Sequence, residues 1–196
     1  MTKTDQNQNP AKAVIGPVRL CFAHLFEPYA FEGQSEEKYS CMVLIPKDDK
    51  KNLAKIKRIQ EAAVKKGVAA RWGGKKPANL AFFLRDGDAE PPASGGEEFD
   101  GCYFATPKSK DAPGIVDGRL QKILDPTEVY SGCYANVSVT AFPYKASGNV
   151  GVGIALNHVQ KVRDGEPLGG QGRAENDFDV LDDLDEGDFD DLFGDL

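Results

Sequence analysis

Lysine and arginine side chains gather in one short stretch of this sequence and could neutralise a polyanion such as a phosphate backbone. Residues 47–76 contain eleven bases and three acids, a net charge of +8. The stretch runs into Arg71-Trp72-Gly73-Gly74-Lys75-Lys76, which places the only tryptophan beside glycines and bases. An exposed ring in such a loop could stack on a nucleic-acid base, at about 1–3 kcal/mol per base. A core position for Trp72 is the alternative.

Other aromatic rings also recur next to bases. The groups are Phe82 and Phe83 before Arg85, Tyr103 and Phe104 before Lys108 and Lys110, and Phe142 and Tyr144 before Lys145. Because side chains alternate between the two faces of a strand, one ring of an adjacent pair can pack in the core while the other stays exposed. The sequence leaves open which ring does which.

This combination favours binding of single-stranded nucleic acid without sequence preference, because every base offers a face for stacking. The residues that we predict to make contact fall into two sets. The phosphate contacts are Arg71, Lys75, Lys76, Arg85, Lys108 and Lys145. The stacking rings are Trp72, Tyr103, Tyr134 and Phe142.

Catalytic patterns are missing from the sequence. It has no phosphate-binding Gly-x-x-x-x-Gly-Lys-Ser/Thr loop, no His-Glu-x-x-His run and no Gly-x-Ser-x-Gly turn. His24 and His158 lie in strand-like stretches, which favours structural or solvent-facing roles. We therefore predict no enzyme, no cofactor, no metal and no small-molecule substrate. A Mg²⁺-dependent nuclease using Asp86, Asp88 and Asp117 is the alternative.

The net charge of −7 hides two segments of opposite sign. Residues 174–196 hold eleven acids and no base, whereas residues 1–173 hold twenty acids and twenty-four bases. Within this acidic tail, Phe189, Leu192, Phe193 and Leu196 have a helical spacing that suits docking on a partner. We expect the tail to be disordered by itself, to compete with nucleic acid for the basic body, and to dock on a partner protein. A purely solubilising tail is the alternative.

Alternating and β-branched segments predict a mainly β protein. The expected strands cover residues 18–26, 38–46, 79–84, 101–106, 131–144 and 150–163. One basic helix begins after Asp48 or Asp49 and ends at Gly67. With about six strands, one helix and many Gly/Pro turns, the pattern favours a Greek-key barrel of five to six strands with one inserted helix.

The length suits one domain with disordered ends. We expect disorder at residues 1–12, a folded body at 13–168 and a flexible acidic tail at 169–196. No apolar run approaches the roughly 20 residues that cross a bilayer, and residues 1–10 lack a signal-peptide core, so no membrane contact and a cytoplasmic location are expected. The four cysteines are widely spaced, which predicts buried free thiols rather than a zinc site.

Six short motifs, in order along the chain, resemble the bacteriophage single-stranded-DNA-binding proteins first catalogued as a family of unknown function. They are GPVRL with FEP (16–20, 26–28), KYS through LIPK (38–47), RWGGK (71–75), LRDGD (84–88), VYSGCY (129–134) and VRDGEPLGG (162–170). The resemblance covers roughly residues 14–172. It implies an OB-fold that coats and protects single-stranded DNA in phage replication, recombination and repair, in the host cytoplasm.

The resemblance also implies that the acidic tail recruits replication proteins. Tails of bacterial single-strand binders usually end in Pro-Phe, whereas this chain ends Phe193-Gly194-Asp195-Leu196. Use of the host protein's docking pocket therefore stays open. Two further alternatives remain at this point: a recombination mediator that anneals complementary strands, and a scaffold that binds only proteins through the tail.

Overall fold

A computed structural model describes residues 9–30, 36–93, 95–146 and 148–168. It contains nine strands, one α-helix and two 3₁₀ helices. The strands are β1 (Lys12–Tyr29), β2 (Lys38–Pro46), β3 (Ala81–Phe82), β4 (Arg85–Asp86), β5 (Cys102–Ala105), β6 (Lys108–Ser109), β7 (Gly114–Val116), β8 (Tyr134–Ala146) and β9 (Asn149–Arg163). The helices are α1 (Lys50–Ala70) and the 3₁₀ turns Glu97–Phe99 and Pro126–Glu128.

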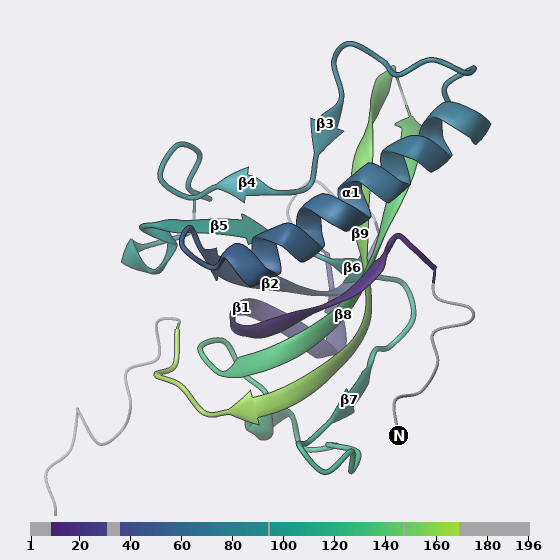
Figure 1. Cartoon of the computed structure of the whole chain (residues 1–196). Helices are drawn as coiled ribbons and strands as arrows, with labels where there is room; N and C mark the ends of the chain where they lie inside the picture. The colour runs from purple at the N-terminus through teal and green to yellow at the C-terminus, as the bar shows by residue number, and fades with distance from the viewer. Residues whose placement is uncertain (1–8, 31–35, 94, 147, 169–196) are drawn as a thin grey trace, which may run out of the picture.

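Five of the strands close into a barrel. In the sheet, β1 pairs with β8, β8 with β9, β9 with β6, and β6 with β2, and β2 pairs back with β1. The short strand β6 completes this ring, since Lys108 pairs with Ser40 on β2 and with Ala155 on β9. The remaining strands extend the sheet from β2 and β9, and α1 lies across β8 and β1 (Figure 1). The expected class, a β-barrel with one inserted helix, is confirmed, and the very short strands raise the count to nine.

The barrel interior follows the alternation read from the sequence. Along β8, Ala135, Val137, Val139 and Ala141 are all buried, as is Cys133 just before the strand. The intervening side chains point to the other face and are half-buried or exposed. Period-two patterning therefore assigned the core face of this strand correctly.

The helix begins where its cap predicts. The Asp49 carboxylate accepts a hydrogen bond of 3.0 Å from the Asn52 backbone N–H, which satisfies one of the free amides of the first turn. Its far end differs from the prediction, because the helix continues through Gly67 to Ala70. Gly67 is buried, and a Cβ there would lie 2.5 Å from the Trp72 ring. The glycine makes room for the tryptophan and does not end the helix.

Between the helix and β5 the regular structure is much shorter than expected. Of the predicted strand at residues 79–84, only Ala81–Phe82 pairs, in parallel with β9. Arg85 and Asp86, which lie just beyond that segment, form β4 against β5. These two-residue strands depend on partners that are distant in sequence, so local patterns do not reveal them.

The ends of the chain lie only partly within the described residues. Ala11 is buried and β1 begins at Lys12, so ordered structure starts inside the segment expected to be disordered. The acidic tail, with Phe189, Leu192, Phe193 and Leu196, lies outside the described residues. Among the residues described, no helix is long and apolar enough to span a membrane.

Candidate nucleic-acid interface

An open groove of about 950 Å³ runs between the β8–β9 hairpin and the strands around β5 and β6. Two large rings beside it are unusually exposed: Phe82 at 43% and Phe142 at 42% of their surface. Tyr144 adds a third, half-buried ring, and Phe104 lines the same groove with only 2% of its surface exposed. Exposed rings beside a groove are what base stacking requires.

Positive side chains line the same groove. Lys38 comes from the start of β2, Arg85 from β4, Lys108 from β6 and Lys110 from just beyond it. Three segments that are far apart in sequence are thus brought together by strand pairing. The groove therefore combines apolar faces for bases with cations for phosphates.

The pKa of Lys108 indicates how these cations are placed. Burial lowers the pKa of its ammonium group, and the nearby charge of Lys38 lowers it further. Both effects penalise the charged form. A bound phosphate would reverse this penalty, because an opposite charge favours the protonated lysine.

Two carboxylates pair with the groove cations. Glu36 contacts Lys110 at 2.5 Å and Lys38 at 3.0 Å, and Glu90 contacts Arg85 at 3.1 Å. The hydrogen bonds from Lys110 and then Lys38 lower the pKa of the Glu36 carboxyl. These exposed pairs are weak, so an incoming phosphate can displace them.

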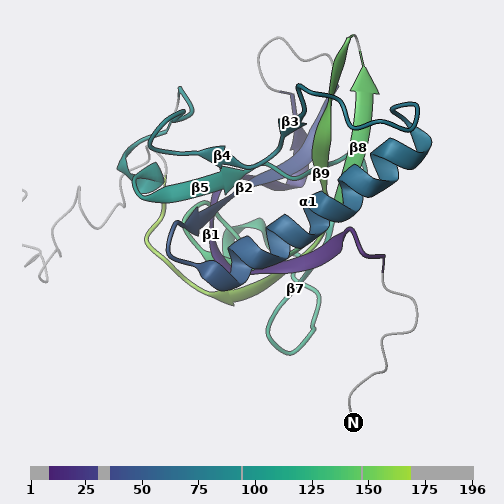
Figure 2. The same cartoon turned by 45° about the horizontal axis from the view of Figure 1, so that its top comes forward.

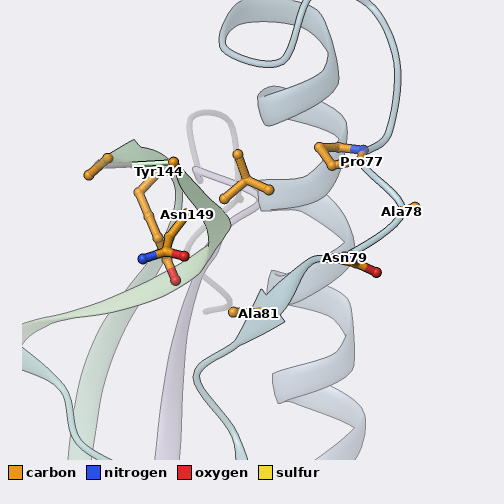
Figure 3. Close-up of a pocket in the computed structure, with 9 residues that line it drawn as sticks. Pro77, Ala78, Asn79, Ala81, Tyr144 and Asn149 are labelled. Atoms are coloured by element: carbon orange, nitrogen blue, oxygen red, sulfur yellow. The ribbon is translucent and has the colours of Figure 1, made fainter.

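A second pocket, of about 760 Å³, adjoins the groove and shares Tyr144 and Ala146 with it. Figure 3 shows its two sides: Pro77, Ala78, Asn79 and Ala81 on one segment, and Tyr144 and Asn149 on the β8–β9 hairpin. Lys75 and Lys76 directly precede Pro77, and Lys145 follows Tyr144. The groove and this pocket adjoin each other, and together we call them the track. Basic residues lie near both of its ends.

Two of the six predicted phosphate contacts, Arg85 and Lys108, line the groove. Lys75, Lys76 and Lys145 are exposed and lie next in sequence to residues that line the adjoining pocket. Arg71 is exposed where α1 ends. Of the predicted stacking rings, Phe142 lines the groove.

Trp72 requires a correction. Only 9% of its surface is exposed, and it belongs to the main core cluster. Its ring packs over Gly67, and its indole N–H donates a 3.2 Å hydrogen bond to the Tyr144 carbonyl oxygen. The ring ties α1 to the hairpin and has no open face for a base.

Tyr103 and Tyr134 also lie away from the groove. Tyr103 neighbours Phe104 on β5, so its ring points to the opposite face, where the Lys47 Nζ is 5.2 Å from its centroid. Tyr134 begins β8, eight residues or about 26 Å along the strand from Phe142. The Arg163 guanidinium already stacks on it, 3.4 Å from the ring centroid.

Sequence reasoning did not select Lys38, Lys110, Phe82 or Tyr144 as site residues. Phe82, Tyr144 and Lys110 belonged to the groups of rings beside bases, and that signal was sufficient to find them. Lys38 precedes Tyr39 but was not among those groups, and it lies at the groove through the pairing of β2 with β6.

The residues considered for catalysis are engaged elsewhere. Asp86 and Asp88 both pair with Lys47, at 2.5 and 2.6 Å, and Asp117 accepts bonds from backbone amides of its own turn. His158 accepts a hydrogen bond from the Gly114 amide. Over the part of the chain that the structure describes, no three potential metal ligands cluster.

The cysteines are free thiols among the described residues, and Cys21, Cys41 and Cys133 are buried as predicted, whereas Cys102 is half-buried. Burial raises the pKa of Cys41 to about 12 and that of Cys21 to about 11. Both thiols therefore stay protonated at neutral pH and are poor nucleophiles.

Comparison with known proteins gives consistent matches. Residues 11–190 match the family model described as Enterobacter phage Enc34, ssDNA-binding protein. Putative protein p50 of Acyrthosiphon pisum secondary endosymbiont phage 1 is 32% identical over 184 residues, covering 87% of this chain and 94% of that protein.

Two solved structures are similar. The single-stranded DNA-binding protein of bacteriophage Enc34 in complex with ssDNA aligns with a TM-score of 0.69 and 26% identity, over 81% of this chain and 90% of that one. The gp2.5 single-stranded DNA binding protein of bacteriophage T7 aligns with a TM-score of 0.55 and 17% identity, over 83% and 97% of the two chains. At that identity, the second match shows a common fold.

Proposed function

The chain belongs to the phage single-stranded-DNA-binding family of Enterobacter phage Enc34, and we propose that it binds single-stranded DNA along the groove between the β8–β9 hairpin and β5–β6. The observation that carries this proposal is the exposure of Phe82 and Phe142 beside four basic side chains. DNA bases would stack on these rings while Lys38, Arg85, Lys108 and Lys110 contact phosphates.

Binding without sequence preference follows from this chemistry. Stacking on Phe82 and Phe142 uses the faces of the bases, and the lysines contact only the backbone, so neither contact reads base identity. Such a protein would coat and protect single strands during phage DNA replication, recombination and repair in the host cytoplasm. It would act by binding alone, without a cofactor or a catalytic step.

The experiment is an anisotropy titration of labelled oligo-dT at increasing salt. If four groove bases contact phosphates, the logarithm of the affinity should fall with the logarithm of salt at a slope of about −3, because each contact on a single strand contributes about 0.7. Affinity should therefore drop about 50-fold between roughly 50 and 200 mM salt. An affinity that barely changes over this range would refute the proposed groove.

The acidic tail would regulate this groove. Its eleven acids offer the same kind of charge as a DNA backbone, so it would compete for the basic body when DNA is absent. Once DNA displaces it, Phe189, Leu192, Phe193 and Leu196 would be available to replication or recombination proteins. In this proposal, residues 13–168 bind DNA and residues 169–196 bind protein partners.

A further inference from the structure

The outer face of α1 carries a dense row of positive charge away from the groove. Its exposed bases occur in adjacent pairs: Lys50 and Lys51, Lys57 and Arg58, and Lys65 and Lys66. The pairs repeat after seven and eight residues, which is about two helical turns, so they share one side of the helix. They follow one another at about 10–12 Å along the axis. Glu61 is the only exposed acid of the helix.

Only Arg58 of this row makes hydrogen bonds to the rest of the described fold: its guanidinium donates to the carbonyl oxygens of Pro10 and Lys12, at 3.0 and 2.9 Å. The core-facing side of α1 is formed by Asn52, Ile56, Ile59, Ala63 and Gly67, roughly opposite the basic side. Within the described parts of the chain, none of the six bases is within 4 Å of a carboxylate. Like charges one turn apart on a helix face repel each other, so the other five side chains gain no ion-pair stabilisation within the described residues.

Crowding of positive charge is also evident at the edge of the row. Lys55 is half-buried between α1 and β1, and its ammonium donates to the Val14 carbonyl oxygen at 2.7 Å. Burial and then the charge of Lys51 lower the pKa of Lys55. A polyanion lying along this face would offset the repulsion between Lys51 and Lys55.

The row connects physically with the DNA-binding track. At its C-terminal end, α1 leads through Arg71, Lys75 and Lys76 to Pro77, which lines the pocket next to the groove. Trp72 fixes this end to the hairpin through its hydrogen bond to Tyr144. Figure 2 shows the end of α1 beside the β8–β9 hairpin, with the following segment crossing towards β3. Basic residues therefore continue along the chain from the helix to the pocket.

We propose that a DNA strand leaving the groove past Tyr144 continues along the outer face of α1, which is a second backbone-binding surface. This inference rests on the proposed function of the groove and extends it. The groove holds bases by stacking, whereas α1 offers no exposed ring and contacts phosphates only. A short oligonucleotide would fill the groove, and only a longer one would reach the helix.

The test compares two double variants of the full-length protein. K65Q/K66Q removes two charges from the end of α1 that is nearest the pocket. R119Q/K122Q removes two exposed charges from the loop after β7, which contributes nothing to the groove. Each protein is titrated with an oligo-dT of about 6 nucleotides and one of about 25, across a series of salt concentrations.

For K65Q/K66Q, the salt slope for the long oligonucleotide should be smaller by about 1.4, which corresponds to two lost phosphate contacts. Its binding of the short oligonucleotide should match that of the wild type, and R119Q/K122Q should match the wild type at both lengths. An unchanged slope for the long oligonucleotide would overturn the proposal.

Two other results are also informative. An equal loss of affinity for both oligonucleotides would overturn the proposal and favour the acidic tail as the occupant of α1. A tail released from α1 by K65Q/K66Q would compete in the groove whatever the DNA length. Failure of the wild type to bind either oligonucleotide would instead refute the function proposed for the groove.

Discussion

At the scale of single residues, the exposure of Phe82 and Phe142 is the feature that stability does not explain. Rings of this size usually contribute to the core, where burying them is favourable. Here both lie at the surface beside a groove lined with bases. Their position is understandable if another aromatic group covers them, and a DNA base is such a group.

Replacing Phe142 by alanine should therefore weaken binding of oligo-dT by about tenfold or more, because one stacked base contributes about 1–3 kcal/mol. Anisotropy titration at constant salt measures the change. Tyr134→Ala is the matched control, since Tyr134 lies on the same strand but far from the groove. Equal losses for both variants would contradict the assignment of the groove.

Glu36 pairs with Lys110 and Lys38, so in the proposed complex it would compete with phosphate for both lysines. Glu36→Gln should tighten binding of a short oligonucleotide by about threefold at low salt, and the gain should shrink as salt screens the pairs. Glu128→Gln removes the same charge from an exposed turn distant from the groove and should have no effect. If Glu36→Gln weakened binding, the carboxylate would have to assist the strand rather than compete with it.

The lowered pKa of Lys108 predicts that the affinity for DNA depends on pH. Its pKa is lowered in the free protein, so as pH rises through that lowered pKa the side chain loses its proton. Phosphate binds the protonated form, so affinity should begin to decrease at a pH below the ordinary lysine pKa of about 10.4. In Lys108→Arg the guanidinium stays charged, and this decrease should be smaller. Identical pH profiles would show that Lys108 does not contact the backbone.

The sequence predicted part of this site. Basic residues near aromatic residues in the sequence indicated Arg85, Lys108 and Phe142 as contacts, and all three line the groove. The same signal could not separate exposed rings from buried ones, and Trp72 is buried because Gly67, five residues earlier, leaves space for it. That contact depends on side-chain packing around the helix end, which local composition does not report.

At the scale of elements, Trp72 joins the end of α1 to the β8–β9 hairpin next to the pocket. Gly67, Trp72 and Tyr144 form a continuous contact from the helix to the hairpin. Gly67→Ala would favour the helix by up to about 1 kcal/mol in propensity. The added methyl would, however, lie 2.5–2.7 Å from three atoms of the Trp72 ring.

The net effect should be destabilisation by about 1–3 kcal/mol, as for other overpacked cores. Urea unfolding followed by circular dichroism measures it. A Cβ added at Gly118 would have no other atom within 4 Å. Gly118→Ala should therefore change the free energy of unfolding by less than about 0.5 kcal/mol. A stabilised Gly67→Ala protein would mean that the ring is free to move away.

Elements with strong local signals were predicted well. The strand at residues 38–46 has the predicted bounds, and α1 starts at the predicted cap. The short strands β4, β6 and β7 were missed, and β3 is much shorter than predicted, because pairing with strands distant in sequence creates them and their own sequence does not. β6 is the clearest case: two residues close the barrel, and one of them is the groove residue Lys108.

At the scale of the whole molecule, the opposite charges of body and tail suggest self-competition. A chain ending at residue 173 should bind oligo-dT about tenfold more tightly than the full chain at low salt, because a tethered competitor acts at millimolar effective concentration. The difference should vanish at high salt, where both contacts are screened. Equal affinities at every salt concentration would exclude competition by the tail.

Photocross-linking tests the central claim of the groove most directly. Oligo-dT carrying 5-iododeoxyuridine would be irradiated on the full-length protein, and the linked residues identified by mass spectrometry. We predict links to Phe82, Phe142 and Tyr144, which line the groove and its adjoining pocket. Links concentrated at Tyr103 or Tyr134, with none in the groove, would contradict the account.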